Sequence, residues 1–173
     1  MGFLAKLFNA TPREKLKGAS LGKDACWEVS PVRDFPSLLG ELHKILPQGS
    51  ILYLEGGTPP AEIGEFLNSH CVPEETHVAM GTIWPKPQAF HLPATAENLS
   101  RLAKLARHCS AMQIAVHLHV YHQGKVLLEW YDAFWKDPFY LSEAVVEERL
   151  KDFCSSLSVT CKRLPSGSGA TSL

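Results

Sequence analysis

Hydrophobic and polar residues alternate most regularly between residues 113 and 135, where two strand-like runs flank the dipeptide Gln123-Gly124. Successive side chains of a strand point to opposite faces of a sheet. His117 and His119 are therefore expected on one face of the first run, and the apolar residues between them on the other face. A glycine-containing pair between two such runs is typical of a tight turn. The pattern predicts a long β-hairpin over residues 113–135.

Helix-like and strand-like segments alternate along the rest of the chain. Further strands are predicted at residues 26–32, 50–55, 77–83, 88–92 and 159–163. Helices, recognised by the spacing of their apolar residues, are predicted to begin at four side-chain caps: Asp34, Thr58, Thr95 and Ser142. The early alternation of strand and helix favours some parallel pairing through crossovers. We therefore expect an α+β fold in which about four helices pack on a mixed β-sheet of about five or six strands.

Composition divides the chain into three parts. Residues 1–24 combine an apolar stripe at positions 3–8 with a locally basic stretch. This segment is expected either to fold back over the core, because short helices are stabilised by packing, or to contact a membrane surface or a partner groove. Residues 25–164 are expected to form a single α+β domain. Residues 165–173 carry too little apolar surface to order themselves and are expected to be a disordered tail.

Overall composition is that of an ordinary globular domain. Of the 173 residues, 45% are hydrophobic and 20% are charged, and the formal net charge is -1. No general attraction to nucleic acid is therefore expected. No apolar run is long enough to span a membrane, and the first residues lack the pattern of a signal peptide. The five cysteines are dispersed without a C-x-x-C pair, which argues against a disulfide framework or a zinc finger and favours a reducing, cytoplasmic location.

Two histidines of the hairpin, His117 and His119, suggest a metal site. The register set by a two-residue turn places Trp130 opposite His117. Leu128 then lies opposite His119, and Asp132 falls on the same face as the histidines. Two imidazoles and a carboxylate form a ligand set for zinc or iron. A one-residue change of register would bring Glu129 instead of Asp132 to the face of the histidines. The alternative to a metal site is that both histidines lie on a partly exposed sheet face, hydrogen-bonded to neighbours or water.

Aromatic residues are densest at the end of the hairpin and just beyond it. Strand periodicity stops after Asp132, so some of these rings are expected on a loop, where exposed aromatic side chains favour recognition. The predicted binding surface consists of Trp84, Trp130, Asp132, Phe134, Trp135 and Tyr140.

Two functional hypotheses follow. The sequence contains no motif for nucleophilic catalysis and none for nucleotide binding. The leading hypothesis is a non-catalytic module of the inhibitor, immunity-like or adaptor type, which binds a protein partner through the aromatic loop and uses no cofactor. The alternative is a small metal-dependent enzyme centred on His117 and His119.

Overall fold

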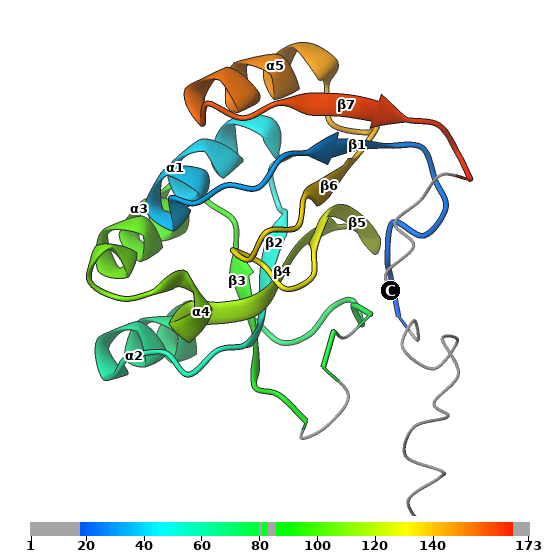
Figure 1. The fold of residues 1–173 in the computed structure, drawn as a ribbon. Helices are drawn as coiled ribbons and strands as arrows, with labels where there is room; N and C mark the ends of the chain where they lie inside the picture. The colour runs from blue at the N-terminus through cyan, green and yellow to red at the C-terminus, as the bar shows by residue number, and fades with distance from the viewer. Residues whose placement is uncertain (1–17, 80, 83–85, 168–173) are drawn as a thin grey trace, which may run out of the picture.

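The computed structural model describes residues 18–79, 81–82 and 86–167, which build one antiparallel β-sheet with helices packed on it (Figure 1). Its seven strands follow the order β3-β2-β4-β5-β6-β1-β7. All neighbouring strands in this sheet run antiparallel. The strands are β1 (Cys26–Val29), β2 (Ile51–Gly56), β3 (Ala89–Pro93), β4 (Ala115–His122), β5 (Lys125–Trp130), β6 (Phe139–Ser142) and β7 (Cys161–Leu164).

The longer helices all bury an apolar stripe against the same face of the sheet. In α1, the Asp34 side chain caps the first turn, and Leu38, Leu42 and Ile45 recur at helical spacing on the buried side. Helices and strands together enclose the main hydrophobic core, to which the strands contribute Leu54 and Leu118 among others. The helices in the described residues are α1 (Phe35–Ile45), α2 (Ala61–His70), α3 (Ala96–Leu105), the 3-10 helix η2 (Ala106–His108), α4 (Ala111–Ile114) and α5 (Glu147–Ser156).

The expected α+β class is confirmed, and the sheet is larger than expected. The additional strand is β6, which lies between β1 and β5. Ser142, expected to cap the last helix, ends β6 instead, and α5 begins at Glu147. The described strands pair only antiparallel, so the expected parallel pairing is wrong for this sheet. Strands β2 and β3, joined through α2 and a long connection, are antiparallel neighbours, and the other strands joined through helices, such as β1 and β2, are not neighbours.

The segment between α2 and β3 differs from its expected form. Residues 77–83 were expected to be a strand, but Val78 forms only an isolated bridge with Ala19. The second helix begins at Ala61 after Pro60 rather than at Thr58. The described part of residues 71–88 is therefore a long irregular segment, which we call the α2–β3 loop. Loops of this length in a compact domain are often functional.

The expected hairpin is confirmed, and its turn has positive φ at both Gln123 (48°) and Gly124 (78°), as a tight hairpin turn requires. The expected register holds beside the turn, where Tyr121 pairs with Val126. A β-bulge then shifts the pairing by one residue, so His119 lies opposite Glu129 instead of Leu128. The bulge allows both Leu127 and Leu128 to join the main core.

The second face of the sheet is polar and aromatic, yet it is buried. It carries the side chains of Tyr53, Glu55, His91, His117, His119, Tyr121 and Glu129, each less than 9% exposed. Two segments lie over it: residues 18–24 and the α2–β3 loop, which are joined by hydrogen bonds of Ala19 to His77 and Ala79. Each segment is attached to one buried carboxylate. Glu129 accepts a hydrogen bond from the Leu21 N–H, and Glu55 accepts two from the loop.

Two of the segments predicted from composition fall mainly outside the described residues. These are the apolar stripe at positions 3–8 and most of the tail, since residues 1–17 and 168–173 are not described. Among the helices that are described, none has the length and apolar character needed to cross a membrane.

Candidate functional site

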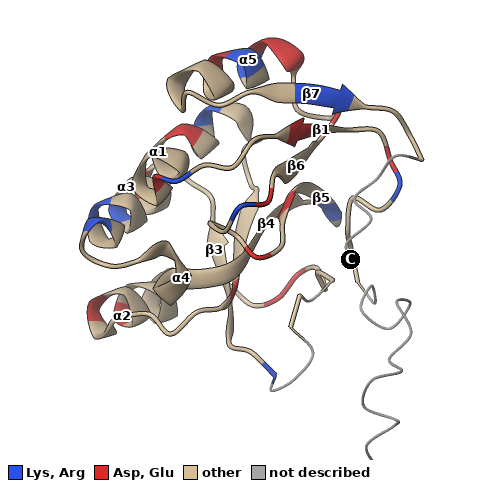
Figure 2. Ribbon diagram, in the orientation of Figure 1, with Lys and Arg blue, Asp and Glu red and all other residues tan. Residues whose placement is uncertain are grey.

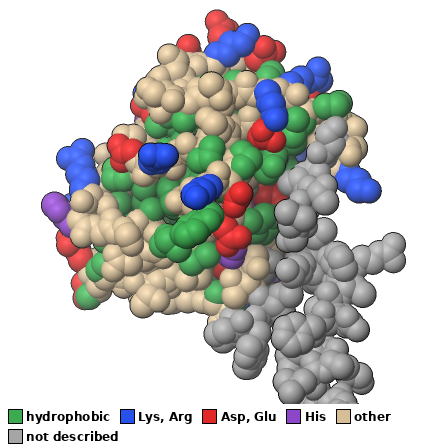
Figure 3. Space-filling model, in the orientation of Figure 1, with side chains coloured by type: hydrophobic (Ala, Val, Ile, Leu, Met, Phe, Trp, Pro, Cys, Tyr) green, Lys and Arg blue, Asp and Glu red, His purple; other side chains and the backbone are tan. Residues whose placement is uncertain are grey.

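The loop between β5 and β6, residues 131–138, presents the most exposed large apolar side chain of the described chain. Trp135 is 64% exposed, whereas the neighbouring Trp130 is fully buried. Hydrogen bonds hold the loop at both ends. The Ala133 N–H donates to the Val116 carbonyl of β4, and the Trp130 ring N–H donates to the Asp137 carbonyl. Figure 3 shows hydrophobic side chains gathered at the centre of this face, between basic and acidic groups.

The loop backbone is strained at two non-glycine residues. Asp132 has φ 47° and Phe134 has φ 69°, in the left-handed region that bulky residues avoid. The Phe134 ring is held between aromatic neighbours, with its centroid 4.4 Å from Trp130 and 4.8 Å from Phe35. Packing of this ring offsets the unfavourable backbone conformation. Strain that is held in this way is typical of functional loops.

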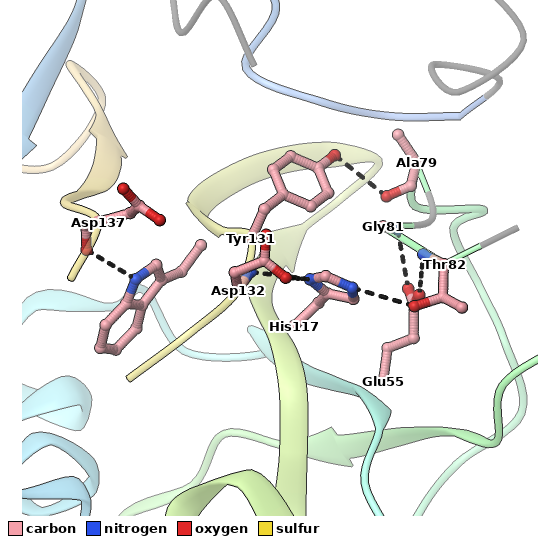
Figure 4. Close-up of polar contacts among 9 residues, drawn as sticks. Glu55, Ala79, Gly81, Thr82, His117, Tyr131, Asp132 and Asp137 are labelled. Carbon is pink, nitrogen blue, oxygen red and sulfur yellow. Dashed lines mark hydrogen bonds and ion pairs between the residues drawn. The ribbon is translucent and has the colours of Figure 1, made fainter. Parts of the chain in front are cut away.

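His117 lies beneath the loop and connects it to the α2–β3 loop (Figure 4). Its Nδ1 accepts a hydrogen bond from the Asp132 backbone N–H at 2.9 Å. A backbone N–H can only donate, so a neutral His117 carries its proton on Nε2. That N–H donates to Thr82 Oγ1 at 3.1 Å. Both ring nitrogens are therefore occupied, one by each loop.

Glu55, from the buried end of β2, fixes the α2–β3 loop beside His117. Its carboxylate is fully buried and accepts hydrogen bonds from the Tyr53 hydroxyl, the Gly81 N–H and the Thr82 N–H. Only glycine fits at position 81, because a Cβ there would lie 2.5 Å from the His117 ring. The backbone of the α2–β3 loop at Gly81 therefore lies close to the His117 ring, and the Glu55 carboxylate holds it there through hydrogen bonds.

Burial keeps the histidines of this face neutral. Desolvation lowers the pKa of His117, and the carboxylates of Glu55 and Asp132 only partly oppose that effect. Desolvation also lowers the pKa of His119, to about 3. Burial and the nearby Glu129 carboxylate raise the pKa of the Tyr131 hydroxyl, which donates to the Ala79 carbonyl at 3.2 Å. At neutral pH the imidazoles and the phenol are uncharged.

His119 differs from its neighbour in having no hydrogen bond. Its ring is fully buried, and neither nitrogen has a partner among the described residues. The ring instead contacts aromatic side chains, with its centroid 4.8 Å from that of Tyr131 and 5.7 Å from that of Tyr53. An unsatisfied buried polar group costs about 1–3 kcal/mol of stability.

The arrangement limits the chemistry that His117 can perform. In its neutral form the ring has no lone pair facing Thr82, so it does not act as a base toward that hydroxyl. Its use as a metal ligand would break one of its two hydrogen bonds. Within the described ranges, no group of three or more His, Cys, Asp or Glu side chains is arranged to hold a metal ion. The metal site formed by His117, His119 and Asp132 stays a prediction.

The residues of the predicted binding surface occupy different environments. Asp132 and Trp135 are exposed on the β5–β6 loop, and Phe134 is half-buried beside them. Trp130 is a core residue that forms the base of the loop. Tyr140 lies on the other face of the sheet, near Leu21, and Trp84 lies outside the described residues.

Sequence reasoning missed the roles of Glu55 and Thr82. The available signal was a glutamate that ends an otherwise apolar strand, because a charged residue in a buried strand requires hydrogen-bond partners. Comparisons with protein-family models, with curated proteins and with solved structures found no match to this chain.

Proposed function

We propose that this protein is a non-catalytic module that binds a protein partner through the β5–β6 loop, with Trp135 as the anchor of the interface. The observation that carries the proposal is the 64% exposure of Trp135 on a loop whose shape is fixed from within. Tryptophan is the residue type most often found at energetic centres of protein interfaces, where it fills a pocket of the partner.

The contacts that fix the β5–β6 loop from beneath favour a role of Trp135 in binding. A side chain on a flexible loop loses conformational entropy when it binds, whereas a fixed loop has already lost it. His117 holds the backbone of Asp132, and Phe134 is packed between two rings. The loop therefore presents Trp135 in a restricted set of positions, which supports its use as an anchor.

Capture from a lysate of the native host cells tests the proposal. Immobilised wild-type protein is compared with Trp135→Ala and with Val146→Ala, a matched control because Val146 is also exposed (57%) but lies at the start of α5. We expect one protein to be retained by wild type and by the control, and to be depleted at least about fivefold by Trp135→Ala. Equal retention by all three proteins would contradict the proposal. Urea denaturation confirms that each variant is folded.

A second candidate function is the metal-dependent enzyme. The observation that favours it is the buried imidazole of His119, whose nitrogens have no partner among the described residues. The zinc and iron content of the purified protein tests this candidate.

A further inference from the structure

A groove of about 750 Å³ runs between α1 and α3 on the helical side of the molecule. Its walls carry basic side chains from both sides: Arg33 precedes α1, and Lys104 and Arg107 lie at the end of α3 and in η2. All three are exposed. Figure 2 shows Lys and Arg positions in blue along α3, which lies next to α1.

The positive charge of the groove is not neutralised within the described chain. Arg33, Lys104 and Arg107 form no ion pair with a described residue, whereas Lys44, Lys151, Lys162 and Arg163 each do. The one acidic residue of the lining is Asp34, and its carboxylate already accepts hydrogen bonds from the N–H and the hydroxyl of Ser37. The groove is therefore an electropositive surface on a chain whose net charge is -1.

A neighbouring groove shows that this charge is local. The groove of about 630 Å³ between α2 and α3 is lined by Glu62, Glu65 and Glu97 together with Arg101 and Lys104. Its acidic residues balance its basic ones, so it offers no comparable attraction to an anion. The grooves on the two sides of α3 thus differ in their balance of charge.

The basic groove lies close to the β5–β6 loop. Phe35 lines the groove, and its ring centroid lies 4.8 Å from that of Phe134 in the β5–β6 loop. A partner that contacts Trp135 is therefore within reach of the groove. Small side chains, Gly40, Ala96, Ala103 and Ala106, line its interior and leave room for a peptide backbone.

We propose that the groove between α1 and α3 receives an acidic segment of the protein partner whose apolar contact is Trp135. This inference rests on the proposed function and adds the chemistry of the partner. Carboxylates of the segment pair with Arg33 and Arg107, whose guanidinium groups match carboxylate geometry. Nucleic acid fits the groove itself less well, because single strands are bound by exposed aromatic rings and Phe35, the Phe, Tyr or Trp residue of the groove lining, is only 3% exposed. Charge complementarity of this kind chiefly steers association and selects the partner.

A fluorescein-labelled hexaglutamate peptide, followed by fluorescence anisotropy at low salt, tests the groove directly. The wild-type protein is compared with a double variant, Arg33→Glu with Arg107→Glu. Arg149→Glu is the matched control, because Arg149 is an exposed arginine of α5 without an ion pair to a described residue. We expect saturable binding to wild type and control, weakened at least about tenfold in the double variant and reduced by added salt.

Three outcomes would overturn the groove proposal: no saturable binding to wild type, equal loss in the Arg149→Glu control, or tighter groove binding of a labelled oligothymidylate than of hexaglutamate. Hexaglutamine serves as the uncharged peptide control. The result is separable from the proposed function, since Trp135→Ala should leave hexaglutamate binding unchanged while it depletes the captured partner. If the charge variants retain the partner but Trp135→Ala does not, the groove proposal fails and the binding loop stands.

Discussion

The Nδ1 atom of His117 accepts a hydrogen bond from the backbone N–H of Asp132, at 2.9 Å, where the loop takes up a left-handed conformation. This contact links a buried imidazole of β4 to the exposed loop that carries Trp135. The other ring nitrogen holds Thr82 of the α2–β3 loop. The His117 side chain therefore holds both the β5–β6 loop and the α2–β3 loop.

Replacing the acceptor at position 117 should loosen the β5–β6 loop. In His117→Leu the Asp132 N–H loses its acceptor, which should lower the free energy of unfolding by about 1–3 kcal/mol and speed hydrogen exchange at Asp132 and Trp135. His117→Asn is the matched control, because its side-chain oxygen can occupy the position of Nδ1. Urea denaturation and amide exchange by NMR measure both effects. Equal exchange rates in the Leu variant and the wild type would show that the contact does not hold the loop.

Acidification should destabilise the protein. An unfolded histidine titrates near pH 6.5, whereas burial lowers the folded pKa of His117 and sets that of His119 to about 3. Between these values the unfolded state binds more protons, so stability falls as the pH falls. Each pH unit below about 6.5 should remove about 1.4 kcal/mol for every histidine that stays neutral in the fold.

Urea denaturation at about pH 7.5 and about pH 5.5 measures this loss. Burial also raises the pKa of Glu129, and uptake of a proton by this carboxylate works in the opposite direction, so a histidine variant is needed to isolate the contribution of the imidazoles. His119→Phe should reduce the pH dependence, whereas His108→Gln, a change at an exposed histidine, should not. Constant stability over this interval would mean that these histidines are not held neutral by the fold.

The same substitution should have opposite consequences at His117 and His119 of β4. His119 has no hydrogen bond to a described residue, so His119→Phe removes unsatisfied polar atoms and should leave stability unchanged or raise it by about 1 kcal/mol. His117→Phe removes two hydrogen bonds and strands the Asp132 N–H, so it should lower stability by about 1–3 kcal/mol. Thermal and urea unfolding rank the variants. A large loss in His119→Phe would indicate that its nitrogens have a partner in solution.

Metal analysis decides between the two candidate functions. We expect purified protein to contain no stoichiometric zinc or iron and its Tm to be unaffected by a chelator, because both nitrogens of His117 are occupied by hydrogen bonds. Near-equimolar metal that is lost in the double variant His117→Gln with His119→Gln would favour the enzyme instead. Plasma emission spectrometry and calorimetry provide the two readouts.

The hairpin and the faces of its first strand could be predicted from the sequence because strand periodicity is a local property. The register could not, since it depends on a bulge that places Leu127 and Leu128 together in the core formed with distant helices. Once the register shifts, Glu129 replaces Leu128 opposite His119. Local pattern therefore identified which residues of β4 share a face. For β5 it was wrong, because Leu128 and Trp130 were expected on the histidine face, whereas the structure places both in the main core and Glu129 on that face.

The candidate site could be predicted only in part for a similar reason. The aromatic loop was visible as a break in periodicity, and Trp135 and Asp132 are exposed there as expected. The hydrogen bonds beneath the loop connect residues that are far apart in the sequence: Glu55 and Thr82 are separated by 27 residues, and Thr82 and His117 by 35. Thr82 lies in an irregular loop, which gives no periodic pattern in the sequence. Burial of Trp130 likewise follows from the tertiary core and not from its neighbours in the chain.

Photo-crosslinking in the native host cells tests the central claim, that the β5–β6 loop contacts a protein partner, most directly. The photoreactive residue p-benzoylphenylalanine is placed at position 136, an exposed position beside Trp135, or at position 149, on the exposed side of α5, in otherwise wild-type protein. We expect one discrete crosslinked adduct from position 136 and none from position 149. No adduct from position 136, or the same adducts from both positions, would contradict this claim.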